Sequence, residues 1–553
     1  MELLKFAAPS KVDSEEVAKM RHWNGWGVEN SAYTTEFGDA ALKMVEALIG
    51  SATPLPSANL EQAIAKVPAT RLPEHPLLEL DSETRLRHAR GQSLPDVLSM
   101  RAGKMDTFPD GVAFPGSSQE VRELLQFAEK NGISVIPYGG GTSVAGHINP
   151  EAGEKPVLTI DMSNMNQLIE LDKESQIATF GAGTPGPLVE EQLQSEGYTL
   201  GHFPQSWELS TVGGWVASRS SGQQSLHYGR IEQLFAGGQM ETPVGVLEIS
   251  SIPASSAGPD IREMILGSEG RMGIITEVKL RVSPLPEQES FHVMFFPSWD
   301  AGLSAARQLA QRKVQLSMVR LSNEMETISL LQVGDTHALA DLESRLAKQG
   351  VSDGKVMMTF GATGSVEQCR SAREITQQIC SDLGGVEGGS ELGKKWAHGR
   401  FRAPYLRDPL LMAGYAVDTM ETAVDWVRVT ESVDALESAI RDAGADLGEQ
   451  VHVYTHLSHV YNQGSSIYTT YLFRCADSYE DTLDRWTKLK TAGAQAIVAS
   501  GGTISHQHGV GSDHRAYLPA EKGPLGIAAI RSLCQLFDPK MQMNPGKLLP
   551  DAD

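Results

Sequence analysis

The sequence predicts an α+β protein of several domains, and three observations support that prediction. The chain has 553 residues, more than one simple core accommodates. Strand, turn and helix signals alternate at short spacing from about residue 105 to 285. A second α+β pattern follows the breaker Pro284-Leu285-Pro286. We therefore predict a helical N-terminal region at 1–104, α+β units at 105–285 and 286–500, and a C-terminal segment at 501–553.

The clearest helix of the first unit covers residues 117–131. Ser117 and Glu120 predict a capping box at its start, and Gly132 ends it. Its apolar face consists of Val121, Leu124, Leu125 and Ala128. Strands are expected at 133–136, 157–162, 176–180 and 273–282, helices around 188–193 and 301–312, and a glycine-rich strand-turn in the tail.

Charge and composition indicate which partners and which compartment to expect. The formal net charge is −22 and the chain has no run of Lys and Arg, so we expect no nucleic-acid partner. A small anionic substrate stays open, because a few arginines can dominate the field inside a pocket. The four cysteines form no CxxC pair, which fits a reducing compartment. With no secretory h-region, no apolar stretch near ~20 residues and no peroxisomal tripeptide at the C-terminus, we expect a cytoplasmic protein.

A glycine-rich segment at 137–143 follows the strand expected at 133–136. Gly139, Gly140 and Gly141 leave backbone N–H groups free to approach an anion, and Thr142 and Ser143 add hydroxyl donors. No lysine follows the glycines as in a P-loop, and the Gly- and Pro-containing residues 144–150 do not open a helix as a Rossmann motif does. The segment predicts a loop that binds a diphosphate, with a plain glycine turn as the alternative.

Two further glycine turns strengthen the first reading. Residues 211–215 form the second turn, and residues 267–275 form a third that leads into a strand. Three turns at strand ends within one unit are typical of a binding site for one long ligand.

The order of these motifs resembles that of a known family. PYGGGTS, STVGGW, GSEGRMGIITE and NPGK follow one another as in the vanillyl-alcohol-oxidase-type FAD enzymes. Within that family the chain resembles the alkylglycerone-phosphate (alkyl-dihydroxyacetone-phosphate) synthases of ether-lipid biosynthesis, through RHWNGWG, FPDGVAFPGSSQEV, MVRLSNE, PYLRDPLL, SSIYTTY and SHQHGVG. The resemblance implies a PCMH-type FAD-binding domain of two α+β subdomains at 105–285, an α+β cap domain over the flavin, and a tail returning to the FAD domain.

The resemblance also implies which residues bind FAD. No cysteine lies nearby and Thr142 stands where some relatives carry a tethering histidine, so we predict a non-covalent flavin. The implied contacts are Pro137, Tyr138, Gly139, Gly140, Gly141, Thr142, Ser143, Gln205, Ser206, Trp207, Glu208, Leu209, Ser210, Thr211, Ser218, Arg219, Ser220, Ser221, Glu269, Gly270, Arg271, Met272, Gly273, Ile274 and Ile275.

Two arginines are candidates for binding an anionic substrate. Arg320 and Arg407 carry guanidinium groups that bind phosphate or carboxylate through two parallel hydrogen bonds. In the family, arginines at both motif positions matter for activity, and the second contacts substrate. A surface or Asp-paired arginine is the alternative, chiefly for Arg407, which Asp408 follows.

The remaining candidates move protons. The family uses the tyrosine at the position of Tyr468 as its acid/base, although a lone strand tyrosine is more often part of the core. A phenol with pKa near ~10 needs positive charge nearby to lose its proton at neutral pH. His202 and Ser268 match further positions important for activity.

His506 and His508, two residues apart on an expected strand, would face one side. A structural pair is the alternative. The synthases carry three successive histidines here, and Gln507 replaces the middle one. A glutamine cannot shuttle protons.

The sequence leaves two enzyme classes open. In the first, an acylated dihydroxyacetone phosphate exchanges its acyl group for a long-chain alcohol without net redox change. In the second, a flavin dehydrogenase or oxidase acts on a 2-hydroxy acid or a phosphorylated polyol. Metal-dependent dehydrogenases of this superfamily are disfavoured, because Tyr468 and Gln507 stand where they carry metal ligands.

A metal site is not expected elsewhere. A second histidine set, His452, His456 and His459, has flanking residues that predict a strand. A flavin-binding protein without activity is a third reading, which the presence of Tyr468 and both arginines opposes. We expect a small anionic substrate that can carry a lipid chain and a homodimer; peripheral membrane contact stays open.

Overall fold

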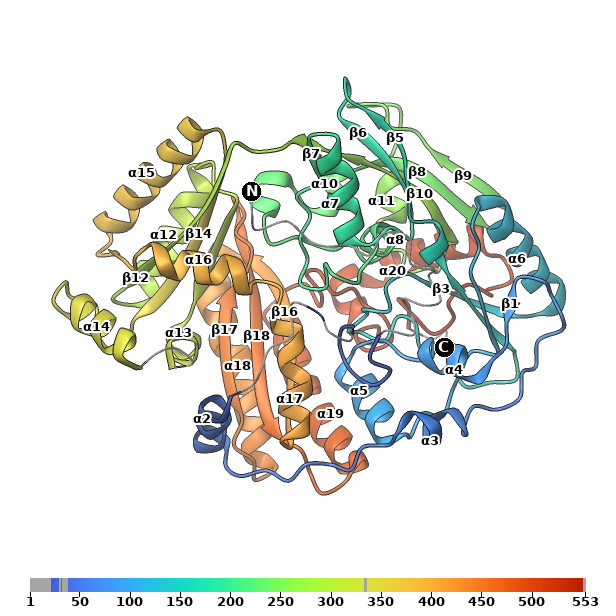
Figure 1. The fold of residues 1–553 in the computed structure, drawn as a ribbon, viewed down its shortest axis with the longest axis horizontal. Helices are drawn as coiled ribbons and strands as arrows, with labels where there is room; N and C mark the ends of the chain where they lie inside the picture. Colours follow the sequence, from blue (N-terminus) through green and yellow to red (C-terminus); the bar gives the residue numbers. More distant parts are fainter. Residues whose placement is uncertain (1–20, 29–30, 32–37, 333–335, 551–553) are drawn as a thin grey trace.

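A computed structural model describes residues 21–28, 31, 38–332 and 336–550 of the chain. Helices and sheets are mixed throughout, as the α+β prediction requires (Figure 1). Before residue 105 the structure contains short helices, whereas the first 20 residues of the predicted N-terminal region lie outside the described part. These helices are α2 (Asp39–Ile49), α3 (Leu60–Ile64), α4 (Ser82–Arg87) and α5 (Leu94–Ala102).

The first sheet places the glycine-rich segment. Its order is β1-β2-β4-β3, in which β2, β4 and β3 run parallel. The strands are β1 (Leu78–Glu79), β2 (Gly111–Ala113), β3 (Ser134–Tyr138) and β4 (Val157–Asp161). Since β3 ends at Tyr138, the glycines begin directly at the end of the strand.

Helix α6 (Ser118–Asn131) packs on this sheet through the four apolar residues predicted for its buried face. Ser117 caps the helix by accepting from the N–H of Glu120, and Gly132 ends it in the left-handed conformation. The predicted capping box is wrong in its second half. The Glu120 carboxylate instead accepts a hydrogen bond of 2.6 Å from the N–H of Gly116, one residue further out.

The second sheet is antiparallel, with the order β5-β6-β10-β8-β9. Its strands are β5 (Leu168–Asp172), β6 (Ile177–Gly181), β8 (Phe235–Thr242), β9 (Gly245–Ile249) and β10 (Ile274–Arg281). The nearby elements are α7 (Gly186–Ser195), β7 (Tyr198–Thr199), α8 (Val212–Ser218), α9 (Ser225–Tyr228), α10 (Ile231–Leu234), α11 (Ile261–Ile265) and β11 (Ser283–Pro284).

The second predicted glycine turn is wrong, because residues 212–218 form helix α8. Thr211 caps this helix by accepting from the N–H of Gly214. Glycine disfavours helices, but packing decides here, since a Cβ at Gly213 would overlap Ala182. The third turn is confirmed as a turn that leads into β10.

The third large sheet has seven strands in the order β15-β12-β14-β13-β17-β18-β16, with antiparallel neighbours. Figure 1 shows it on the other side of the molecule from the first two sheets. Its strands are β12 (Gln288–Phe296), β13 (Met318–Ser322), β14 (Val356–Gly364), β15 (Val386–Glu387), β16 (Tyr415–Asp425), β17 (His452–Leu457) and β18 (Gly464–Arg474).

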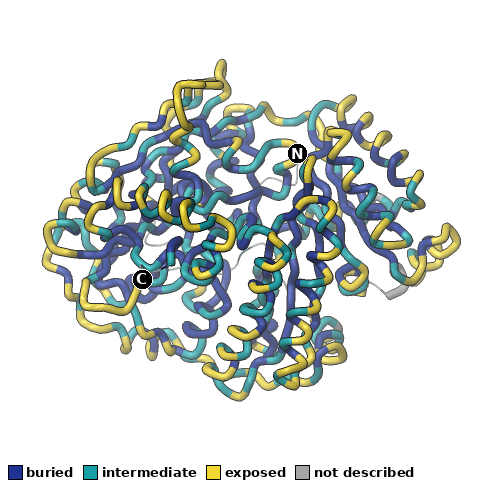
Figure 2. The backbone as a smooth tube through the Cα atoms, turned by 180° about the vertical axis from the view of Figure 1, so that it is seen from behind, coloured by how far each residue is buried: buried dark blue, intermediate teal, exposed yellow. Residues whose placement is uncertain are grey.

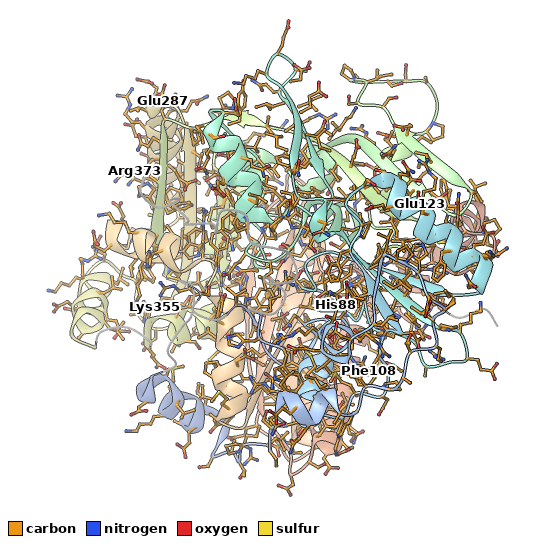
Figure 3. All side chains as sticks on the ribbon, turned by 45° about the vertical axis from the view of Figure 1, so that its right-hand side comes forward. His88, Phe108, Glu123, Glu287, Lys355 and Arg373 are labelled. Carbon is orange, nitrogen blue, oxygen red and sulfur yellow. The ribbon has the colours of Figure 1, made fainter. Side chains whose placement is uncertain are left out.

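Helices pack on both faces of strands β12 and β14 of this sheet, and α18 packs on β17 and β18. The helices that accompany the sheet are α12 (Trp299–Gln311), α13 (Glu324–Gln332), α14 (Thr336–Ala347), α15 (Val366–Asp382), α16 (Ser390–Gly399), α17 (Arg407–Met412), α18 (Val429–Asp446) and α19 (Tyr479–Ala499). In Figure 3, Arg373 on α15 and Glu123 on α6 mark opposite ends of the molecule. The strands of the seven-stranded sheet are largely buried, and the interior of the tube in Figure 2 is mostly dark blue.

The tail returns to the first sheet, where Met543 forms a parallel bridge with Val135 of β3. Helix α20 (Leu518–Phe537) precedes this contact. The predicted strand-turn of the tail is wrong, because in the described tail, 501–550, Met543 makes an isolated bridge and no strand forms. The domain boundaries themselves stay a prediction.

Candidate active site

A cavity of about 610 Å³ lies between the first two sheets and the seven-stranded sheet. The glycine-rich segment, helix α8 and the third glycine turn line one side of it. Strands β13, β16, β17 and β18 line the other side, together with residues of the tail. Segments that are more than 300 residues apart in the sequence therefore meet at one place.

The glycine-rich segment contributes unpaired backbone donors to the cavity. Within the described part of the chain, the N–H groups of residues 140–143 donate to no protein acceptor. A Cβ at Gly140 would overlap the backbone of Leu209, and one at Gly141, with φ of 65°, would overlap Tyr138. The glycines are thus needed both for the exposed donors and for the close approach of the segment to residues 209–211.

Most residues expected to contact the cofactor line the cavity. They are Pro137, Tyr138, Gly139, Gly140, Gly141, Thr142, Ser143, Gln205, Ser206, Ser210, Thr211, Ser218, Ser220, Ser221, Glu269, Gly270, Gly273, Ile274 and Ile275. The others lie behind this wall, namely Trp207, Glu208, Leu209, Arg219, Arg271 and Met272. Trp207 stacks on Phe401, and Arg271 donates to the carbonyl groups of Met543 and Asn544.

The residues of this wall fit FAD. Successive backbone N–H groups without protein acceptors form an anion-binding site for a diphosphate, and the volume lies within the range of cofactor pockets. The buried Oε1 of Gln205, which has no protein partner in the described structure, adds a polar contact at the wall.

The opposite wall is one face of the seven-stranded sheet. Side chains alternate between the two faces of a strand, and the cavity-lining residues of four strands follow this alternation apart from Asp418, which also lines the cavity. These residues are Met318, Arg320, Val417, Thr419, His452, Tyr454, His456, Tyr468, Thr470 and Leu472. Thr455, on the other face, donates a hydrogen bond of 2.7 Å to Glu437 of α18.

Tyr468 lies on this wall between two histidine rings. Its ring centroid is 5.0 Å from that of His456 and 5.7 Å from that of His508, and its hydroxyl donates to Thr419 over 3.2 Å. Burial raises the pKa of Tyr468 above its ordinary value, and the carboxylates of Glu421 and Asp418 act in the same direction. The side chain is therefore a phenol at neutral pH, and Arg320 does not supply enough positive charge to reverse this.

Arg320 belongs to a buried cluster with Glu326 and His456. Its Nη2 donates to Glu326 Oε1 over 2.8 Å, and the same oxygen lies 2.9 Å from Nδ1 of His456. Although burial opposes it, the charge of Arg320 lowers the pKa of Glu326 to about 2. Arg320 thus reaches the cavity as a cation whose orientation Glu326 fixes.

Arg407 lines the cavity from the start of α17. Its Nη1 and Nη2 donate to the backbone oxygen and to Oε1 of Gln92, over 2.5 and 2.6 Å. Asp408 instead pairs with Arg101, so the predicted alternative of a pair between Arg407 and Asp408 is not observed. Within the described residues the Nε of Arg407 has no partner.

The loop 505–508 is held against the seven-stranded sheet by Glu421 of β16. Oε1 of this buried carboxylate accepts from the backbone N–H groups of Gln507 and His508, over 2.7 and 2.6 Å. Two successive N–H groups cannot point to one acceptor in a strand, which is why the strand predicted for His506 and His508 is wrong.

The two histidines of this loop consequently have different surroundings. Gln507 and His508 line the cavity, whereas His506 is buried beside it. Nε2 of His506 lies 2.6 Å from the hydroxyl of Tyr461 and 2.6 Å from Nη1 of Arg230. Burial and the charge of Arg230 hold the pKa of His506 well below its usual value, so this ring is neutral.

His202 and Ser268 are both buried on the cofactor side. Nε2 of His202 lies 2.8 Å from the hydroxyl of Ser220, and burial lowers the pKa of His202 to about 3. His202 lies behind the wall, whereas Ser268 lines it. A neutral His202 therefore positions Ser220.

Several residues of the cavity were not predicted from the sequence. His147 and Glu326, which line the cavity, and Glu421, which holds the loop beside it, have no motif of their own, and only their partners reveal them. The position of His456 could have been predicted, because it follows His452 and Tyr454 with a period of two and therefore shares their face of the strand. Within the described residues, no group of three or more His, Cys, Asp or Glu side chains is placed to hold a metal ion.

Comparisons with known proteins identify the class first. Residues 109–250 match the FAD binding domain family, and residues 285–548 match the FAD linked oxidases, C-terminal domain. The protein is therefore a PCMH-type FAD enzyme, and the predicted cofactor and fold class are confirmed.

The particular family follows from its relatives. The alkyldihydroxyacetonephosphate synthase of Dictyostelium discoideum is 32% identical over 504 residues, which cover 90% of this chain and 82% of that protein. A solved structure of an alkyldihydroxyacetonephosphate synthase superposes with a TM-score of 0.80 at 26% identity, and covers 97% of this chain and 100% of that one. The chain belongs to the alkyldihydroxyacetonephosphate synthase family, as the resemblance predicted.

A relative with another activity is also similar. The mitochondrial D-lactate dehydrogenase (cytochrome) of Arabidopsis thaliana is 26% identical over 458 residues, which cover 81% of this chain and 74% of that protein.

Proposed function

We propose that the protein forms an ether bond, by replacing the acyl group of an acylated dihydroxyacetone phosphate with a long-chain alcohol. One C–O bond to a carboxylate breaks and one C–O bond to the alcohol forms, so no electrons are lost or gained overall. The observation that carries this proposal is the convergence of Tyr468, Arg320 and His508 on the wall opposite the cofactor segments. FAD supplies the electrophilic chemistry at the substrate carbon when it is bound.

Tyr468 moves the protons of this exchange. As a phenol it donates its proton to the departing carboxylate, and the phenolate then takes the proton of the incoming alcohol. His456 and His508 confine the ring on both sides, and Thr419 accepts from its hydroxyl between turnovers. One proton leaves and one returns, so the side chain is restored.

Arg320 and Arg407 bind the phosphate group of the substrate. Arg320 is the better candidate of the two for this contact, because Glu326 accepts from only one of its nitrogens. Arg407 keeps Nε free of protein partners within the described structure, while Gln92 fixes the other two nitrogens. A fork of N–H donors suits a phosphate better than a single ammonium group does.

The apolar end of the cavity accommodates a lipid chain. It reaches helix α2 and helix α13, where Leu330 is 45% exposed. The apolar side chains at this end are Met44, Val45, Leu330, Leu410 and Leu472. Such a lining, together with the anion-binding arginines, matches a substrate with one charged and one long apolar part. Within the described residues, no helix is long and apolar enough to cross a membrane.

The test is turnover of the FAD-loaded protein. Palmitoyl dihydroxyacetone phosphate and hexadecanol should yield free palmitate and an ether-linked product in equal amounts, without consumption of an electron acceptor. Acid precipitation of the same protein should release the flavin, as a non-covalent cofactor requires. Palmitate release that does not depend on the alcohol would contradict the exchange.

The alternative is a dehydrogenase of a 2-hydroxy acid or a phosphorylated polyol, which the similarity to D-lactate dehydrogenase favours. The same arginines would bind its carboxylate or phosphate. Under anaerobic conditions such a substrate should bleach the flavin to its reduced form, whereas an acyl-group exchange leaves the flavin oxidised at the end.

A further inference from the structure

Ser143, the last residue of the glycine-rich segment, is paired with a histidine from the following loop. Ser143 Oγ lies 2.6 Å from Nδ1 of His147, and both residues line the cavity. Ser143 Oγ also accepts from the backbone N–H groups of Ala145 and His147, over 3.4 and 3.0 Å. With its lone pairs directed at these N–H groups, the hydroxyl has one proton left to donate, and the nearest acceptor is a neutral His147.

Glu269 lies on the other side of the same imidazole. Its Oε1 is 3.2 Å from Nε2 of His147, close enough for an ion pair. The carboxylate is fixed by the backbone N–H groups of Val510 and Gly511, over 2.5 and 2.8 Å. Asn544 holds both backbones together, because its Nδ2 donates to the carbonyl oxygens of His147 and Glu269. Residues 510–511 and Asn544 of the tail therefore hold Glu269 and His147 in place, and His147 in turn contacts Ser143.

This arrangement determines which nitrogen of His147 carries a proton. Nε2 makes no hydrogen bond within the described residues, but the Glu269 carboxylate at 3.2 Å favours a proton on that nitrogen, which leaves Nδ1 to accept from Ser143 when the ring is neutral. When the ring takes up a second proton, Nδ1 becomes a donor to Ser143 Oγ and takes the lone pair that the longer contact, from the N–H of Ala145 at 3.4 Å, uses when the ring is neutral. The hydroxyl proton of Ser143 must then turn away from His147, and the open direction is the cavity.

The charges around His147 favour the protonated ring. Those that face it are Glu269 and Asp513, which stabilise the cation, and Lys547, which opposes it. Although burial acts against the charged form, these carboxylates raise the pKa of His147 above its usual value.

We propose that His147 and Glu269 are positioning residues for FAD, which act by turning the hydroxyl of Ser143 into the cavity as a hydrogen-bond donor to the anionic cofactor. The geometry assigns this role to residues outside the glycine motif itself. This role concerns the binding of FAD and not the proposed reaction, so its test does not depend on which substrate the enzyme uses.

The test is the pH dependence of FAD affinity in the protein stripped of flavin, measured by quenching of flavin fluorescence between pH 5.5 and 8.5. In the wild type, Kd should rise with pH as His147 loses its proton, by roughly tenfold, the value expected for one charge-assisted hydrogen bond. His147→Gln keeps an acceptor toward Ser143 at every pH, so its Kd should be high and nearly constant over this range. Exposed His227 provides the matched control, and His227→Gln should keep the wild-type slope.

A second variant tests the same inference without altering the histidine. Ser143→Ala deletes one hydroxyl, and it should also give a high Kd without the wild-type slope. Combining both substitutions should weaken binding no further than either alone. A wild-type slope in His147→Gln or in Ser143→Ala, or a wild type whose Kd is constant with pH, would overturn the proposal.

Discussion

The two walls of the cavity are built in different ways. On the cofactor wall, backbone N–H groups of residues 140–143 face the ligand, and glycines let neighbouring segments approach closely. On the opposite wall, side chains of four strands face it, and buried partners such as Glu326 and Glu421 hold them. Backbone donors suit the diphosphate of FAD, which is the same in every turnover. On the second wall, substitution of a single side chain can change which substrate is bound.

The largest effect should come from the side-chain wall. Tyr468→Phe removes the proton that the reaction needs and leaves the packing between His456 and His508 intact. We expect turnover to fall by about 10³-fold, within the range for general acid–base catalysis, while FAD affinity changes less than twofold. Turnover above a tenth of the wild-type rate would show that another group moves the proton.

The cofactor wall should respond in the opposite way. Gly140→Ala would force the glycine-rich segment away from the backbone of Leu209. We expect the Kd for FAD to rise by about 100-fold, since overpacking costs about 1–3 kcal/mol and the displaced donors add to that. Gly153→Ala is the control, because a Cβ there meets no atom within 4 Å. Equal Kd values for the two variants would contradict the difference between the walls.

A smaller effect is expected from Arg320→Lys, which replaces a fork of donors by a point charge. KM for the phosphorylated substrate should rise roughly tenfold, and the Kd for FAD should stay the same. Arg373→Lys, at the far end of the seven-stranded half (Figure 3), should change neither value. A parallel loss of FAD in the Arg320 variant would place this arginine with the cofactor instead.

The smallest effect should come from Glu421→Gln. The amide oxygen can still accept from the N–H groups of Gln507 and His508, but the charge that helps to raise the pKa of Tyr468 is gone. The pKa of the phenol should fall, so the alkaline limb of the pH–rate profile should shift to lower pH. An unchanged limb with a reduced rate would leave Glu421 a purely structural role.

The sequence predicted the cofactor wall better than the substrate wall, and the reason is physical. Glycine turns and helix caps act through neighbouring residues, so the segment 137–143 and helix α6 could be read locally. The cluster of Arg320, Glu326 and His456 forms between residues up to 136 positions apart, and no local pattern encodes it. Predictions from local pattern were wrong where a residue distant in sequence determines the backbone. Glu421, for example, accepts from two successive N–H groups of residues 505–508 and thereby prevents the expected strand.

The central claim is that cofactor and substrate share one cavity with two unlike walls. It is tested most directly by adding the ether-linked product of the proposed exchange, without the fatty acid that the reverse reaction would need, to the FAD-loaded protein. The account predicts a saturable change in the visible absorption of the flavin, with the same Kd that calorimetry gives and with a higher Kd in Arg320→Lys. Binding detected by calorimetry without any change in the flavin spectrum would contradict it.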